Sequence, residues 1–160
     1  MVGESFFKVL AHQGKAPLMS RDVVTADLVL TLVLPGETSW PVTAHVAFDT
    51  SDPYAVSVTF LTGEGAEEDA SEGVCWTFAR QLLTDGITRP VGVGDVRVHP
   101  QQTDGGAVVV LQMTSPHGEA TFEAAMHDVV EFLADTYALV PTGSESAYVD
   151  VDAAIAQILG

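Results

Sequence analysis

The sequence predicts an α+β domain, in which about seven mostly antiparallel strands precede the main helices. Two observations carry this prediction. Apolar residues take every second position in several stretches between residues 24 and 125, and short turns separate these stretches. From Met126 onward the apolar residues recur at helical spacing instead. The change of period places a long helix after the strands.

Three alternating stretches at the start of the domain predict an antiparallel meander. Apolar side chains take every second position in residues 24–34, 42–48 and 54–60, as in strands that bury one face. Pro35-Gly36 ends the first stretch. Residues 49–53, Asp-Thr-Ser-Asp-Pro, predict a tight turn, because aspartate side chains accept hydrogen bonds from nearby backbone amides. Short connections of this kind join antiparallel neighbours.

The next part of the chain predicts an acidic loop, a fourth strand and a short helix. Residues Glu64 to Glu72 combine carboxylates with small residues, which is typical of a solvated hairpin loop. The alternation of Val74, Trp76 and Phe78 indicates a strand. Arg80 to Gly86 then reads as a short helix that the glycine ends.

The second part of the chain predicts three further strands and a longer helix. The strands are expected near Asp95 to His99, at residues 107–114 and at residues 118–125. From Met126 to Val140 an amphipathic helix is predicted, whose apolar stripe consists of Met126, Val129, Val130, Leu133, Tyr137 and Val140. A second C-terminal helix is predicted from Asp150, which stands at an N-cap position before residues 151–159. The two parts therefore suggest two similar halves, each of strands followed by a helix.

Length and composition favour one folded domain over residues 21–160, because a chain of 160 residues with 47% apolar content can bury a sizeable core. Residues 1–20 are expected to be a flexible N-terminal extension. The single cysteine, Cys75, cannot form an intramolecular disulfide and suits a reducing cytoplasm. No apolar run reaches the roughly 18 residues that a membrane helix needs, so direct membrane insertion is not expected.

The charge of the chain is strongly one-signed. Asp and Glu number 22 against 6 Lys and Arg, which gives a formal net charge of −16. Such a surface repels nucleic-acid phosphate and anionic lipid, so no nucleic-acid partner is expected. After Arg21 the basic residues are Arg80, Arg89 and Arg97. They are the candidate partner-binding residues, and the alternative for each is a structural ion pair with one of the many carboxylates.

No catalytic, cofactor or metal site emerges from the motifs. Asp49-Thr50-Ser51 resembles the turn of an aspartic protease, but the glycine and a second copy are missing, and the segment is explained as a turn. The histidines show no zinc-binding spacing. The acidic stretch lacks the alternating ligands of a calcium loop, and no glycine-rich nucleotide motif opens a helix. A carboxylate-dependent hydrolase centred on Asp49 is retained as a minor alternative.

Several segments, in order along the chain, resemble the SsgA-like proteins. They are residues 49–56 (Asp-Thr-Ser-Asp-Pro-Tyr-Ala-Val), 76–83 (Trp-Thr-Phe-Ala-Arg-Gln-Leu-Leu), 89–98 (Arg-Pro-Val-Gly-Val-Gly-Asp-Val-Arg-Val), 115–120 (Ser-Pro-His-Gly-Glu-Ala) and Phe132-Leu133. The resemblance covers about residues 22–160, and it leaves the N-terminal extension and the length of the acidic loop unexplained.

The resemblance implies a non-enzymatic actinobacterial protein of sporulation-specific cell division. It implies a cytoplasmic protein at the division septum that recruits FtsZ, has an SsgA-type partner and forms a homo-oligomer, with a trimer favoured. It also implies a fold similar to the Whirly proteins, with two sheet–helix halves. Because Whirly proteins bind single-stranded nucleic acid, that activity is the alternative function, although it requires a basic groove that this composition does not supply.

Overall fold

A computed structural model of the chain describes residues 22–36, 38–61, 74–149 and 158. Its elements, in chain order, are β1 (Val23–Val33), β2 (Ser39–Asp49), β3 (Ala55–Phe60), β4 (Val74–Ala79), α1 (Arg80–Gly86), β5 (Val91–Val93), β6 (Val96–Thr103), β7 (Gly106–Ser115), β8 (Gly118–Ala125), α2 (Met126–Leu139) and the 3-10 helix η4 (Glu145–Tyr148). The strands form one sheet in the order β4-β3-β2-β1-β8-β7-β6-β5, and every neighbouring pair is antiparallel.

The sheet consists of two halves that join between β1 and β8. In each half four strands are followed by one helix, β1–β4 by α1 and β5–β8 by α2. β1 pairs with β2 along its whole length, from Val23↔Asp49 to Val33↔Ser39. The pairing between the halves is much shorter and runs from Thr31↔Glu123 to Val33↔Thr121. The α+β class and the two-half arrangement that the sequence predicts are therefore seen in the fold.

The sheet is strongly curled. The rings of Phe60 on β3 and Phe122 on β8 stack with their centroids 4.3 Å apart, although β2 and β1 lie between these two strands. In a flat sheet, strands three positions apart are separated by roughly 14 Å. Curling brings their side chains together on the inner side of the sheet, where the core forms.

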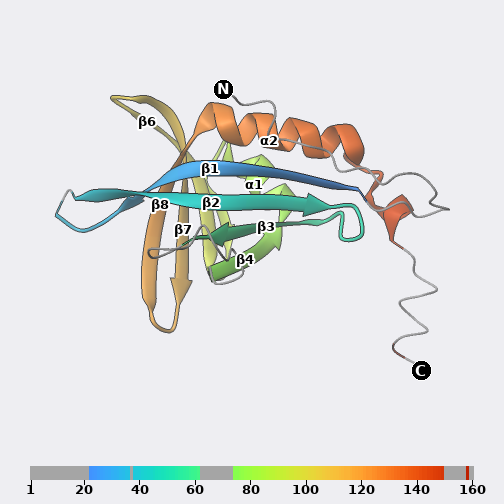
Figure 1. The fold of residues 1–160 in the computed structure, drawn as a ribbon, viewed down its shortest axis with the longest axis horizontal. Helices are drawn as coiled ribbons and strands as arrows, with labels where there is room; N and C mark the ends of the chain where they lie inside the picture. The colour runs from blue at the N-terminus through green and yellow to red at the C-terminus, as the bar shows by residue number, and fades with distance from the viewer. Residues whose placement is uncertain (1–21, 37, 62–73, 150–157, 159–160) are drawn as a thin grey trace.

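Both helices cover the inner side of the sheet. α2 runs alongside β1 (Figure 1) and packs on β1, β7 and β8. Its buried residues include Val129 and Leu133, which belong to the stripe that the helical spacing predicts, and also Phe132, which does not. α1 packs against β3, β4, β5 and β6. The core combines these helices with the alternating apolar residues of the strands, among them Val24, Leu30, Val46, Phe48, Val56, Val58, Val98, Val109 and Leu111.

The structure corrects the predicted elements in two places. The described part of the chain contains eight strands instead of about seven, because β5 forms where the sequence indicated only an approach to the next strand. Three residues are too short for an alternating pattern to be recognised. In addition, η4 forms between α2 and Asp150. The acidic loop and the N-terminal extension lie outside the described residues, and so does the predicted second C-terminal helix except for Ile158.

Candidate functional site

Arg80, the first candidate partner-binding residue, lies in the interior of the protein. It is the first residue of α1 and is 1% exposed. Its Nη1 donates to the carbonyl oxygen of Thr136 at 3.2 Å and to the Thr136 hydroxyl at 3.3 Å. Its Nη2 donates to Oε2 of Glu145 at 3.0 Å. Arg80 therefore forms the structural ion pair that the sequence left open as the alternative to partner binding.

Two aromatic rings complete the surroundings of the Arg80 guanidinium. Its central carbon lies 3.9 Å from the centroid of Tyr137 and 4.7 Å from that of Phe48. Contacts of this kind are favourable because the face of an aromatic ring attracts a cation, more strongly where water is excluded. Phe48 belongs to β2 and Tyr137 to α2, so one buried cation contacts both halves of the fold.

The pKa of Glu145 is lowered from its usual value. The largest cause is the hydrogen bond from its own backbone amide, and the side chain of Arg80 and the backbone N–H of Gly143 add to it. The Gly143 N–H donates to Oε1 at 2.9 Å. The carboxylate is thus held charged by hydrogen bonds on both oxygens, and this keeps the buried Arg80 neutralised.

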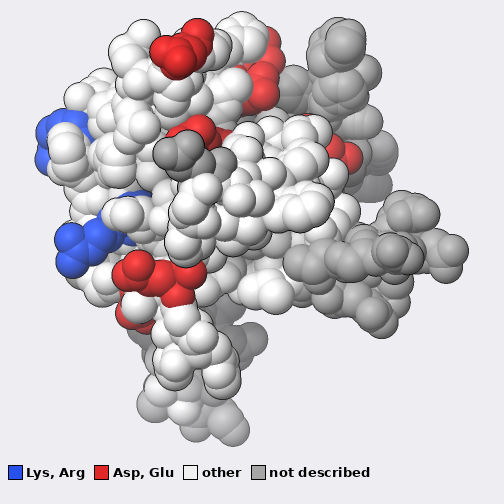
Figure 2. All heavy atoms as spheres, turned by 90° about the vertical axis from the view of Figure 1, so that its left-hand side faces the viewer, with Lys and Arg blue, Asp and Glu red and all other residues white. Residues whose placement is uncertain are grey.

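Arg89 and Arg97, in contrast, lie at the surface. Arg89 forms an ion pair with Asp85 at 3.3 Å across one helical turn, and its side chain is 63% exposed. Arg97 stands on β6 opposite Gly92 of β5, where a Cβ on the glycine would lie 2.7 Å from Arg97 Cγ. Among the described residues, the basic side chains gather toward one side of the face that Figure 2 shows, beside several acidic groups. These two arginines remain candidates for contact with a partner.

The Asp49 segment forms the turn that the sequence predicts. The Asp49 carboxylate accepts hydrogen bonds from the backbone N–H and the hydroxyl of Ser51, each at 2.8 Å. Thr50 is buried, and its hydroxyl accepts a hydrogen bond from the Asp22 amide at 2.9 Å. The Asp49 carboxylate therefore organises the turn, and Thr50 holds the residue before β1. This structural role explains the segment without a catalytic one.

The histidines that the structure describes are dispersed. The shortest of their polar contacts joins His45 Nδ1 to Asp27 at 2.7 Å across β1 and β2, and His127 lies 3.6 Å from Glu131 on α2. Within the described ranges, no group of three or more His, Cys, Asp or Glu residues is arranged to hold a metal ion. None of the helices in the described part is long and apolar enough to cross a membrane.

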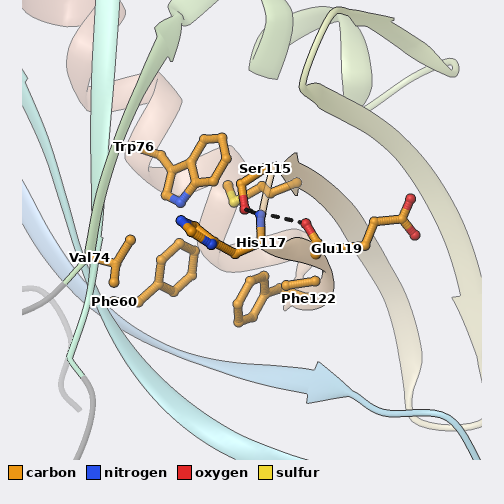
Figure 3. Close-up of a pocket in the computed structure, with 10 residues that line it drawn as sticks. Phe60, Val74, Trp76, Ser115, His117, Glu119 and Phe122 are labelled. Carbon is orange, nitrogen blue, oxygen red and sulfur yellow. Dashed lines mark hydrogen bonds between the residues drawn. The ribbon is translucent and has the colours of Figure 1, made fainter.

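A hollow that the sequence did not predict lies between β4 and the β7–β8 hairpin. It has a volume of about 290 Å³. Phe60, Met113 and Phe122 are buried at its base. Trp76 and His117 point toward each other across it, and Val74 stands beside them (Figure 3). Alternation assigned Trp76 to the apolar face of a strand, but only the curl of the sheet brings it close to Phe122.

The sequence of this chain is similar to that of one known protein family. The model of the family described as "Streptomyces sporulation and cell division protein, SsgA" matches residues 42–145. The chain belongs to the SsgA family. An SsgA-family relative from Frankia casuarinae, "Sporulation-specific cell division protein SsgB", is 48% identical over 138 residues, which cover 86% of this chain and 92% of the relative. The SsgB protein of Streptomyces coelicolor is 46% identical and is covered over 95% of its length.

Solved structures of the SsgA family share the fold. A structure described in work on SsgB and longitudinal cell division in Streptomyces coelicolor has a TM-score of 0.74 and 43% identity, and the match covers 84% of this chain and 99% of the other. An SsgA-like sporulation-specific cell division protein from Thermobifida fusca has a TM-score of 0.75 and 38% identity, with 89% and 98% covered. The family resemblance predicted from the ordered segments is confirmed.

Proposed function

We propose that this sporulation-specific cell division protein acts without catalysis, by helping to position septa and by recruiting FtsZ through protein–protein contacts. The observation that carries the proposal is the high identity to proteins named SsgB over most of both chains. An SsgA-type protein is the second proposed partner. The proposed location is the cytoplasm at the division septum, and the proposed assembly is a homotrimer.

The charge of the chain supports an electrostatic contribution to this recognition. On a protein with a net charge of −16, the exposed Arg89 and Arg97 offer cationic positions that an acidic group of a partner would select. The acidic surface around Arg89 and Arg97 disfavours wrong partners and fixes the orientation of the right partner. We therefore propose that Arg89 and Arg97 take part in the contact with FtsZ.

Binding of purified FtsZ to the full chain tests the proposal. Arg89→Gln with Arg97→Gln is expected to weaken the complex roughly tenfold if both charges meet the partner. Ser39→Glu with Thr43→Glu is the matched control, because it lowers the net charge equally at two exposed positions of β2. Its affinity is expected to stay within about twofold of the unmodified chain.

Each result of this experiment has a definite meaning. Failure of the unmodified chain to bind FtsZ, together with intact septation after deletion of the gene, would show that recruitment is not its function. Equal affinity of the unmodified chain, the arginine double variant and the control would keep recruitment but remove the two arginines from the interface.

A further inference from the structure

β4 forms one edge of the sheet, and this edge is unusually open to pairing. It is the outermost strand next to β3, and no other described strand lies beyond it. Its sequence, Val-Cys-Trp-Thr-Phe-Ala, contains neither a charged residue nor a proline. Proteins commonly protect edge strands with such residues, because unpaired backbone groups otherwise bind another strand. β4 lacks these devices, which is expected of an edge that is used for binding.

The hydrogen-bond register identifies the backbone groups that face outward. Arg80 N donates to Tyr54 O at 2.8 Å, and this pair continues the β3–β4 register in which Val58 opposes Trp76. Because hydrogen-bonded pairs alternate along an antiparallel ladder, the even-numbered residues of β4 bond to β3. The N–H and C=O groups of Cys75 and Thr77 consequently point away from β3.

The hollow described above lies on the inner face beside this edge. Trp76 and Val74 line it from β4, and Val74 is 56% exposed. A strand added along β4 would direct alternate side chains to this inner face, because side-chain direction alternates along a strand. A side chain opposite Trp76 would then enter the hollow and cover Phe60, Met113 and Phe122, which line it. The open edge and the hollow therefore form one continuous binding surface.

We propose that the β4 edge binds an extended segment of a partner protein, with one apolar side chain in the hollow and basic residues beside it. Among the described residues that line the hollow there is neither lysine nor arginine, and Glu119 is the only acidic one. The carboxylate of Glu119 points out of the hollow (Figure 3) and is available to a cation at the rim. The net charge of −16 likewise favours a positively charged segment in the partner. This mode of recognition is strand addition, in which backbone hydrogen bonds supply affinity and the hollow supplies selectivity.

The test uses the full chain and a labelled synthetic peptide in which lysine alternates with valine and leucine. Thr77→Pro is expected to weaken its binding roughly tenfold, because proline removes an N–H that β3 does not use. Val74→Lys places a charge at the mouth of the hollow and is expected to weaken binding similarly. Val29→Lys is the matched control, since Val29 is 67% exposed on β1 and the charge change is the same. Circular dichroism checks that each variant is folded.

The proposal is supported if the peptide binds, if Thr77→Pro and Val74→Lys each weaken it and if Val29→Lys has less than about a twofold effect. A peptide with serine in place of valine and leucine must bind at least about tenfold more weakly. Equal binding of both peptides, or equal binding by all variants, would show that the peptide is held only by unspecific charge attraction. Either result would overturn the proposal. Absence of binding would overturn it as well. So would sedimentation showing that Thr77→Pro dissociates an oligomer, because a second copy would then occupy this edge.

Discussion

The guanidinium of Arg80 lies 3.9 Å from the centroid of the Tyr137 ring, and this contact fastens α1 to α2. A hydrogen bond of 2.6 Å between the hydroxyls of Thr84 on α1 and Tyr137 on α2 strengthens the contact between the two helices. The strands of the two halves pair only from Thr31↔Glu123 to Val33↔Thr121. The contacts around Arg80 therefore stabilise the junction of the two halves where the sheet contributes few hydrogen bonds.

Removal of the Arg80 side chain is expected to be strongly destabilising. Arg80→Ala removes the cationic partner of the Glu145 carboxylate and opens a void between Phe48 and Tyr137, so the free energy of unfolding should fall by about 3 kcal/mol or more. Arg80→Lys keeps the charge but not the planar fork, and should cost about 1–2 kcal/mol. Urea titration measures both values as shifts of the midpoint at constant slope.

Arg89→Ala provides the control for this prediction. Its ion pair with Asp85 is exposed to solvent, and pairs of this kind contribute about 0–1 kcal/mol. The midpoint should therefore move little. An equal loss in Arg80→Ala and Arg89→Ala would show that burial does not distinguish the two arginines.

Gly86→Ala is expected to destabilise the protein because α1 approaches β6 closely at this residue. A Cβ on Gly86 would lie 2.2 Å from Val98 Cγ1 and 2.5 Å from its Cβ, and Val98 is fully buried. Overpacking of this kind costs about 1–3 kcal/mol. Gly105→Ala is the control, since its nearest neighbour would be 3.9 Å away. Thermal unfolding should separate the two variants, and equal melting temperatures would contradict the close approach.

Arg80 and Gly86 also show which parts of the fold could be predicted from the sequence. The pattern at Arg80–Gly86 predicted α1 with the observed bounds, because local spacing and a glycine define a short helix. The reason for a glycine at position 86 could not be predicted from the sequence. It does not adopt the left-handed conformation of a helix-ending glycine and is instead required for the contact with Val98 on β6.

The same limit applies to the candidate site. The three arginines could be selected by composition, but the burial of Arg80 depends on Thr136 and Glu145, which are 56 and 65 residues away in sequence. The hollow likewise joins Trp76 to Phe122 through the curl of the sheet. Alternation indicates which face a residue occupies, but it contains no information about which distant strands face one another.

Asp135→Asn is expected to stabilise the protein at neutral pH. The pKa of Asp135 is raised by burial and secondarily by the charge of Glu131, and its Oδ2 is a buried atom without a hydrogen-bond partner among the described residues. A raised pKa means that the folded state disfavours the charged carboxylate, so its cost is present above the folded pKa and disappears as pH falls. The gain should be about 0.5 kcal/mol at pH 7 and smaller near pH 4.

Thermal unfolding at both pH values measures this effect, with Asp128→Asn as the control on the same helix. Asp128 lies in the first turn of α2, where a negative charge is favourable to the helix dipole. Its neutralisation should therefore lower the melting temperature at pH 7. A rise of equal size in both variants would indicate a general effect of net charge instead of the environment of Asp135.

Single-stranded nucleic acid is expected not to bind, although the family resemblance implied a Whirly-like fold. Strand-binding proteins use a basic groove with stacking aromatic rings, whereas the net charge here is −16. Of the arginines that the structure describes, Arg80 is buried and ion-paired with Glu145, whereas Arg89 and Arg97 lie at the surface. Fluorescence anisotropy with labelled oligonucleotides at about 50 mM salt favours any electrostatic binding, so a flat titration is expected there. Saturable binding that weakens with added salt would show instead that a local cationic surface outweighs the acidic net charge.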